Sequence, residues 1–232
     1  MGSYKNIFFD LDHTLWDYKR NEQLTIKTLL AKYDLKDFST NIDSFFAIYT
    51  PTNELLWEKL QKKEIKRSDL IINRFSITFN KMGIDDPLLI NRFATDFVEL
   101  NPYQKSLIPY TRELLNYLYP KYNLYIITNG FTSTQEIKLE KSEIKKYFKK
   151  VYTSEKAAAS KPSKSFFQYA IKSSNAKKAE SLIIGDSLHN DIAGAINFNL
   201  DYIYFNPSNK TCSIPIDPKR AITSLKELFK LL

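Results

Sequence analysis

Short apolar runs alternate with segments of helical periodicity along most of this chain. A short continuous apolar run bounded by polar residues is typical of a buried strand. Such runs occupy residues 4–9, 122–127, 151–154, 181–185 and 202–205. Strands that alternate with helices predict a parallel sheet with right-handed crossovers. The pattern therefore predicts an α/β fold with a doubly wound, Rossmann-like parallel sheet.

The long segment after the first run carries helical patterns only. Apolar residues recur there at helical spacing in four groups. The groups are Leu24, Ile26, Leu29 and Leu30; Phe45, Phe46, Ile48, Tyr49, Leu55, Leu56 and Leu60; Leu70, Ile71, Phe75 and Phe79; and Leu88, Leu89, Phe93 and Phe97. Four amphipathic helices of this kind predict a small bundle.

We therefore predict that the chain has two parts. The sheet and its helices, made of residues 1–15 and 106–232, form a core. The helical bundle, made of residues 16–105, is inserted into this core as a cap.

The cap would be joined to the core by a hinge. Trp16 and Asp17 on one side and residues 101–104 on the other would form it, and such a hinge permits the cap to open over a cleft. Aromatic residues near and within the cap, such as Trp16 and Tyr49, could stack on a flat ligand, but helical spacing favours a place in the bundle core.

Acidic side chains follow two of the predicted strands. Asp10 and Asp12 come directly after the first run, and Asp186 and Asp191 follow the run at 181–185. Residues i and i+2 of an extended chain share a face, so Asp10 and Asp12 can point into one cleft. Two carboxylates at such a short distance repel each other unless a cation or a shared proton compensates their negative charge.

Other polar groups follow neighbouring strands. Thr128, Asn129 and Gly130 end the run at 122–127, and Lys161 lies in a polar loop between strand signals. Ligands of open parallel α/β sheets bind outside the carboxyl ends of the strands. These residues therefore mark that edge of the sheet as the candidate site.

Glycine is scarce and concentrated near these segments. The chain has 5 glycines in 232 residues, about 2% against an average near 7%. Gly130, Gly185 and Gly194 nevertheless fall in or beside the candidate site. This placement indicates that the backbone geometry matters there.

Four segments, taken in order, resemble the motifs of a known superfamily. They read Asp-x-Asp-x-Thr at 10–14, Thr-Asn-Gly at 128–130, Ser-Lys-Pro at 160–162 and Gly-Asp-Ser-x-x-Asn-Asp at 185–191. This order resembles the haloacid dehalogenase superfamily, most of whose members are magnesium-dependent phosphohydrolases. Leu15-Trp16-Asp17, Phe131 after Thr-Asn-Gly and the helical insert are most similar to the pyrimidine 5′-nucleotidase branch.

The resemblance implies a role for each acidic residue. Asp10 would be the nucleophile and form an aspartyl-phosphate, which splits hydrolysis into two steps. Asp12 would protonate the leaving alcohol and then accept a proton from water. Mg²⁺ would be held by Asp10, by the backbone carbonyl of Asp12 and by Asp186. Asp191 would orient metal-bound waters or Lys161, or would cap the following helix.

The resemblance also implies a phosphate site. Lys161 would offset the charge on the nucleophile and the phosphate. The Thr128 hydroxyl and the amides of Asn129 and Gly130 would hold the phosphate oxygens.

Two residues depart from the superfamily pattern. His13 stands where most relatives have glycine or an acidic residue, and histidine tolerates a positive φ better than most residues, so we expect the turn to persist. Ala158 stands where relatives usually carry glycine ahead of the lysine, which leaves the geometry of that loop open.

Composition bounds the compartment and the partners. Cys212 is the only cysteine, so no internal disulfide is expected and the cytoplasm is the simplest location. No apolar run approaches the roughly 18 residues of a membrane span. The net charge of +8 includes lysine pairs such as Lys145-Lys146. Without a nucleic-acid motif we interpret them as solvated surface, so neither nucleic acid nor membrane is an expected partner.

These observations predict a Mg²⁺-dependent phosphomonoester hydrolase that acts on a small phosphorylated metabolite, first of all a nucleoside 5′-monophosphate. The alternatives are a phosphatase of sugar phosphates or other small metabolites, a haloacid dehalogenase, and a non-catalytic protein phosphorylated on Asp10. Asp12 argues against the dehalogenase, which would not need an acid or base there. Asp12, Lys161 and the cap favour turnover over regulation. The oligomeric state is left open between a monomer and a weak dimer.

Overall fold

The computed structural model of this chain describes residues 4–35, 42–209, 211 and 216–232. The chain divides into two compact units, which we call the sheet unit and the helical unit. The sheet unit contains Met1–Lys19 and Lys105–Leu232, and the helical unit contains Arg20–Gln104. Cys212 lies outside the described residues.

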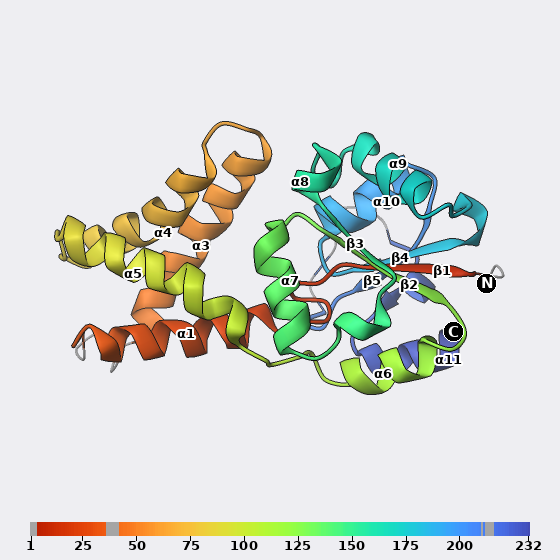
Figure 1. Cartoon of the computed structure of the whole chain (residues 1–232), viewed down its shortest axis with the longest axis horizontal. Coiled ribbons are helices and arrows are strands. Elements are labelled where there is room, and N and C mark those ends of the chain that lie inside the picture. The colour runs from red at the N-terminus through yellow and green to blue at the C-terminus, as the bar shows by residue number, and fades with distance from the viewer. Residues whose placement is uncertain (1–3, 36–41, 210, 212–215) are drawn as a thin grey trace. The chain divides into compact units, whose positions relative to one another are not determined.

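The described residues of the sheet unit form a six-stranded parallel sheet with the order β3-β2-β1-β4-β5-β6. Strands β1 to β5 are labelled in Figure 1. The strands are β1 (Asn6–Phe9), β2 (Asn123–Thr128), β3 (Lys150–Thr153), β4 (Ser181–Gly185), β5 (Asp201–Phe205) and β6 (Ala221–Ile222). The predicted doubly wound α/β fold is confirmed. Each of the five apolar runs is a strand, whereas β6 is two residues long and too short for such a run to indicate it.

Helices cover both faces of this sheet (Figure 1). Their bounds are α6 (Thr111–Leu118), α7 (Thr132–Lys141), α8 (Ser154–Ala157), α9 (Lys164–Ser173), α10 (Gly194–Asn197) and α11 (Leu228–Leu231). A π-helical segment, Leu188–Ala193, precedes α10. Single turns of 3₁₀ helix occupy Lys145–Tyr147, Lys178–Glu180, Pro218–Arg220 and Leu225–Glu227.

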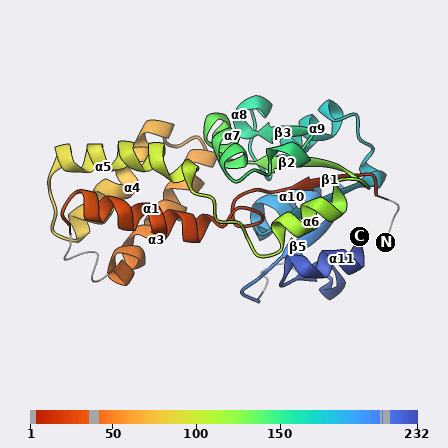
Figure 2. The same ribbon diagram turned by 60° about the horizontal axis from the view of Figure 1, so that its bottom comes forward.

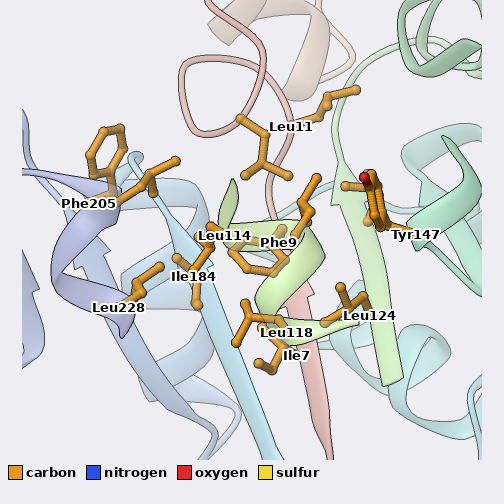
Figure 3. Packing of buried hydrophobic residues seen from close by; sticks show 14 of the residues in the cluster. Ile7, Phe9, Leu11, Leu114, Leu118, Leu124, Tyr147, Ile184, Phe205 and Leu228 are labelled. Carbon is orange, nitrogen blue, oxygen red and sulfur yellow. The ribbon is translucent and has the colours of Figure 1, made fainter. Parts of the chain in front are cut away.

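The alternation of side chains along β1 divides the core into two layers. Ile7 and Phe9 face one layer, where they belong to the same buried cluster as Leu114 and Leu118 of α6 (Figure 3). Phe8 faces the other layer and clusters with Phe166 of α9. Successive residues of a strand point to opposite faces, so this one strand anchors helices on both sides of the sheet.

Strand β1 also lies at the point where the order of the sheet reverses. It pairs with β2 on one side and with β4 on the other. The crevice outside the carboxyl ends of strands at such a point is the usual ligand site of an open α/β sheet. Asp10, the last residues of β2 and Asp186 all lie at these ends.

The described residues of the helical unit form four long helices, which Figure 2 shows. They are α1 (Tyr18–Lys32), α3 (Ile42–Gln61), α4 (Arg67–Lys81) and α5 (Pro87–Leu100). Their core is aromatic, with Tyr49 stacked on Phe75 at 5.4 Å between ring centroids and Phe79 edge-on to Phe93 at 5.0 Å. The helical spacing of aromatic residues thus correctly predicted a bundle core.

Three leucines that the periodicity places in the apolar groups are exposed. Leu24, Leu55 and Leu88 have exposed fractions of 43%, 51% and 73%. Leu24 is two positions from the buried Ile26, which is about 200° around the helix. One bundle core cannot cover both sides of a helix, so only the stripe that contains Ile26 is buried.

The segments that join the two units are paired with each other. The Trp16 and Leu107 backbones form an antiparallel bridge, and the Asp17 N–H donates to the Ser106 carbonyl at 3.1 Å. Trp16 is fully buried in the sheet unit, whereas the sequence pattern placed it in the cap. The predicted hinge residues Asn101–Tyr103 form a 3₁₀ turn of the helical unit.

No helix in the described ranges is both long and apolar enough to cross a membrane.

Candidate active site

A buried lysine connects two carboxylates at the centre of the site. The Lys161 Nζ donates to Asp10 Oδ1 at 2.6 Å, to Asp191 Oδ1 at 2.6 Å and to the Ile127 carbonyl at 3.0 Å. Asp10 follows β1 directly, and its N–H donates to the Ile184 carbonyl of β4. All three charged side chains are less than a tenth exposed. The structure therefore brings together three predicted site residues that are far apart in sequence.

Asn129 fixes the backbone of that lysine. The Lys161 N–H donates to Asn129 Oδ1 at 2.8 Å, and the Asn129 Nδ2 donates to the Lys161 carbonyl at 3.0 Å. These two bonds use both ends of the side-chain amide. The Asn129 side chain thus positions Lys161 in this structure, a contact that the sequence did not predict.

Thr14 links the first motif to the fourth. Its Oγ1 accepts from the Asp186 N–H at 3.1 Å and lies 3.0 Å from Asp186 Oδ1 and 3.3 Å from Asp10 Oδ2. The single hydroxyl proton can serve one carboxylate at a time. Thr14 is part of the Asp-x-Asp-x-Thr motif, but the sequence analysis gave it no role.

Asp191 can lie close to the end of β4 because Gly185 has no side chain. Its Oδ2 accepts from the Ser187 N–H at 3.1 Å. A Cβ placed on Gly185 would overlap the Asp191 carboxylate. Gly185 does not have a positive φ, so its function is to leave room for this side chain rather than to permit an unusual backbone conformation.

The cluster has more negative than positive charge. Asp10, Asp186 and Asp191 each offer a carboxylate oxygen, and the three oxygens lie within 4.8 Å of one another. Lys161 is the cation paired with this group. Three carboxylates and one ammonium leave an excess of two negative charges when all are ionised. A divalent cation would balance this excess, and an oxygen-only donor set suits Mg²⁺.

The pKa values of these groups reflect the same imbalance. Burial, opposed by Lys161 and assisted by Asp191 and Asp186, raises the pKa of Asp10 well above its ordinary value. Burial and then the charge of Asp191 raise the pKa of Asp186 from 3.8 to about 7. Burial disfavours the Lys161 ammonium, but Asp10 and Asp191 outweigh it, so that the pKa of Lys161 is raised. Both carboxyl pKa values are raised by features that a bound cation would offset.

The Asp12 side chain contacts different partners from those of Asp10. Its Oδ1 pairs with the Lys138 Nζ at 2.6 Å, and its Oδ2 accepts from the Gln135 Nε2 at 2.8 Å. Both partners come from α7, the helix after the Thr-Asn-Gly motif. The sequence analysis did not identify Gln135 and Lys138. What distinguishes them from the other polar residues of α7 is their burial, which the sequence does not show.

Thr128 and Gly130 lie beside this pair. The Thr128 Oγ1 accepts from the Gly130 N–H at 3.1 Å and from the Gln135 Nε2 at 2.7 Å. A Cβ on Gly130 would overlap the Gln135 side chain. Gly130, like Gly185, therefore leaves space that another side chain fills in this structure. The predicted phosphate contacts of Thr128 and Gly130 stay predictions.

Both departures from the motif pattern occupy the left-handed region. His13 has a φ of +66° and Ala158 a φ of +51°. This confirms that the turn at His13 persists with a positive φ. At Ala158 the same conformation explains why glycine would be favoured there, since only glycine adopts it without steric cost.

The parallel α/β sheet with acidic groups and a buried lysine at the carboxyl ends of its central strands defines a class of hydrolase. The Haloacid dehalogenase-like hydrolase family model matches residues 7–205, and the chain belongs to that family. The predicted superfamily and the predicted enzyme class, a phosphatase of this superfamily, are thereby confirmed.

Individual relatives agree with this membership over their full length. The pyrimidine 5′-nucleotidase PynA of Streptococcus pneumoniae is 31% identical, with 99% of this chain and 95% of PynA covered. The pyrimidine 5′-nucleotidase YjjG of Escherichia coli is 29% identical, with 97% and 96% covered. The crystal structure of the HAD-hydrolase YfnB from Bacillus subtilis, bound to magnesium, is 28% identical, covers 98% of both chains and has a TM-score of 0.85.

Proposed function

We propose that this chain hydrolyses nucleoside 5′-monophosphates with Mg²⁺ through an aspartyl-phosphate on Asp10. The contact that carries the proposal is the 2.6 Å bond between Lys161 Nζ and Asp10 Oδ1. A carboxylate held at a strand end by a buried cation is preorganised to attack a phosphorus atom. The similarity to two nucleotidases supports the choice of substrate.

In the first step, Asp10 displaces the nucleoside. A carboxylate oxygen of Asp10 forms a bond to phosphorus, and the bond between phosphorus and the nucleoside 5′ oxygen breaks. Asp12 donates a proton to that leaving oxygen, so that an alcohol departs instead of an alkoxide.

In the second step, water releases the phosphate. The water oxygen bonds to phosphorus while Asp12 accepts a proton from it, and the bond between phosphorus and the Asp10 oxygen breaks. Asp10 and Asp12 return to their starting states, with Asp12 again protonated for the next turnover. The balance of the two steps is a nucleotide and water converted to a nucleoside and inorganic phosphate.

The charged groups around Asp10 would stabilise these steps. Lys161 offsets negative charge on the nucleophile and on the phosphate, in a site where burial strengthens electrostatic interactions. Asp191 accepts a hydrogen bond from the same ammonium at 2.6 Å and so orients it. The hydroxyl proton of Thr128 would be donated to a phosphate oxygen.

The fit of the donor set supports a Mg²⁺ cofactor. Asp10 and Asp186 would hold the ion with the backbone carbonyl of Asp12, and Asp191 would hold its waters. When bound, Mg²⁺ neutralises the phosphate oxygens and the excess carboxylate charge. The function of the helical unit Arg20–Gln104 as a cap, with a part in substrate choice, stays a prediction.

A substrate panel tests the proposal. We expect kcat/KM with Mg²⁺ for dUMP, dTMP and UMP to exceed that for a hexose phosphate and for a phosphorylated three-carbon acid. Stacking of a base contributes on the order of 1–3 kcal/mol, so a preference rather than absolute specificity is expected. A sugar phosphate preferred by tenfold, a gap of about 1.4 kcal/mol, would contradict the nucleotidase assignment and leave the phosphatase assignment intact.

A further inference from the structure

Both oxygens of the Asp12 carboxylate accept hydrogen bonds from side chains of one helix. Lys138 and Gln135 of α7 contact Oδ1 and Oδ2 at 2.6 and 2.8 Å. Residues three apart lie on the same face of a helix. One face of α7 therefore presents a cation and an amide to a single carboxylate.

Lys138 is buried where its charge needs an anion. Its side chain is 3% exposed, and its ammonium lies 4.4 Å from the Trp16 ring centroid and 5.2 Å from that of Tyr18. Aromatic faces attract a cation but do not replace its hydration shell. A buried ammonium is costly unless it is paired and hydrogen-bonded, and Asp12 provides that partner.

The orientation of the Gln135 amide is fixed by its neighbours. Its Nε2 donates to Asp12 Oδ2 and to Thr128 Oγ1, whereas its buried Oε1 has no hydrogen-bond partner among the described residues. The opposite orientation would set an oxygen against the Asp12 carboxylate, because an ionised carboxylate only accepts. Gly130 leaves the space that this side chain fills. Gln135 is thus held in place to donate to Asp12.

We propose that Lys138 and Gln135 are positioning residues that hold the Asp12 carboxylate in the orientation from which it exchanges protons with the leaving group and with water. The inference rests on the proposed function, in which Asp12 is the acid and base. Each carboxyl oxygen has two lone pairs, so the proton that Asp12 transfers occupies a lone pair that neither Lys138 nor Gln135 uses. An aspartate side chain in open solvent populates several rotamers. Two bonds from one helix restrict it to one orientation, so proton transfer should depend on α7 although α7 need not touch the substrate.

The leaving group distinguishes this function from a structural one. p-Nitrophenolate departs with little help from an acid, whereas a nucleoside alkoxide requires a proton. Loss of Asp12 positioning should therefore slow a nucleotide much more than p-nitrophenyl phosphate. A general loss of folding or of metal binding should slow both alike.

The experiment compares kcat and KM for UMP and p-nitrophenyl phosphate, with Mg²⁺, in the full chain. We expect Lys138→Met and Gln135→Glu to lower kcat for UMP by about tenfold or more, and kcat for p-nitrophenyl phosphate by less than about threefold, since general acid–base catalysis contributes on the order of 10²–10⁴. KM should change little in Lys138→Met. Gln135 also donates to Thr128, which is a predicted phosphate ligand, so Gln135→Glu is judged by the ratio of its two kcat losses. Gln135→Glu is nearly isosteric and sets a second carboxylate against Asp12.

Two further variants serve as controls. Lys138→Arg keeps the charge and should restore at least part of the UMP rate. Lys156→Met removes a lysine that also pairs with α7, at Glu136, but in an exposed ion pair of 3.2 Å. It should leave both substrates unchanged. The midpoint of urea denaturation shows whether each variant folds. If Lys138→Met does not fold, the kcat values of Gln135→Glu and Lys138→Arg test the proposal instead.

The outcomes separate this inference from the proposed function. Asp12→Asn should show the same dependence on the leaving group, and its absence there would overturn the proposed acid and base. A second outcome is that Asp12→Asn slows UMP more than p-nitrophenyl phosphate, whereas Lys138→Met and Gln135→Glu slow both substrates equally. That outcome would overturn the positioning function alone. An increased UMP rate in Lys138→Met would overturn it as well, because it would mean that the ion pair restrains Asp12 from reaction.

Discussion

At the scale of single residues, the site depends on the positive charge of Lys161, which compensates the negative charges of Asp10 and Asp191. Its ammonium contacts Asp10 and Asp191 at 2.6 Å in a region with almost no solvent access. Removing the cation from a buried ion pair leaves uncompensated carboxylates. Such losses usually cost about 3–5 kcal/mol of folding free energy.

We therefore expect Lys161→Met to abolish phosphatase activity and to lower the free energy of unfolding by about 3 kcal/mol or more, as measured by urea denaturation without Mg²⁺. Lys5→Met is the matched control. It removes an ion pair with Glu180 in which the lysine is 63% exposed, and an exposed pair is worth less than about 1 kcal/mol. Equal stability losses in the two variants would contradict the buried-pair interpretation.

Gly185 shows why residue-scale geometry was only partly predictable. The concentration of glycine at strand ends correctly marked Gly130 and Gly185 as constrained. The reason is different from the one expected, because each leaves space for a distant side chain, Gln135 or Asp191. A sequence does not show which side chain approaches a glycine from another element.

This observation predicts that Gly185→Ala displaces Asp191 or the end of β4. We expect a loss of about 1–3 kcal/mol in unfolding free energy, typical of an overpacked core, and a loss of most of the kcat. Gly83→Ala is the control, since Gly83 has a φ of +84° and open space around its Cα. It should cost stability through its backbone alone and leave kcat unchanged. Normal kcat in Gly185→Ala would contradict the predicted effect.

At the scale of elements, the strands were predictable and the contribution of α7 was not. Apolar runs located β1 to β5 because each strand contributes apolar side chains to the packed layers of the sheet, and β1 and β4 are buried along their whole length. The motif residues at their carboxyl ends converge because the strands are parallel. The pairing of Asp12 with Lys138 depends on how α7 packs on the sheet, and helical periodicity does not determine that. Leu24 was misplaced for a related reason, since a helix offers more apolar positions than one core can bury.

At the scale of the whole molecule, metal binding, stability and pH should be linked through the acidic cluster. Asp186 has its pKa raised from 3.8 to about 7 in the folded chain. Between these values the folded state holds a proton that the unfolded state has released. Stability without Mg²⁺ therefore falls as the pH rises through this window, by the linkage of proton binding to folding.

Mg²⁺ should reverse this contribution, because it binds the ionised carboxylates and competes with the proton. We expect the increase in Tm on adding Mg²⁺ to be clearly larger at pH 8 than at pH 5.5, measured by differential scanning fluorimetry. Asp186→Asn should lose most of the increase at pH 8. An equal or larger increase at pH 5.5 would contradict the linkage.

Asp10 is the proposed nucleophile, and an acid quench during turnover tests this role most directly. The chain is mixed with UMP and Mg²⁺, quenched within one turnover and analysed by tandem mass spectrometry of its peptides. We expect a phosphoryl group on Asp10, no such group when EDTA replaces Mg²⁺, and neither the group nor activity in Asp10→Asn. Full turnover by Asp10→Asn, or a phosphoryl group on a different residue of the wild-type chain, would contradict the account.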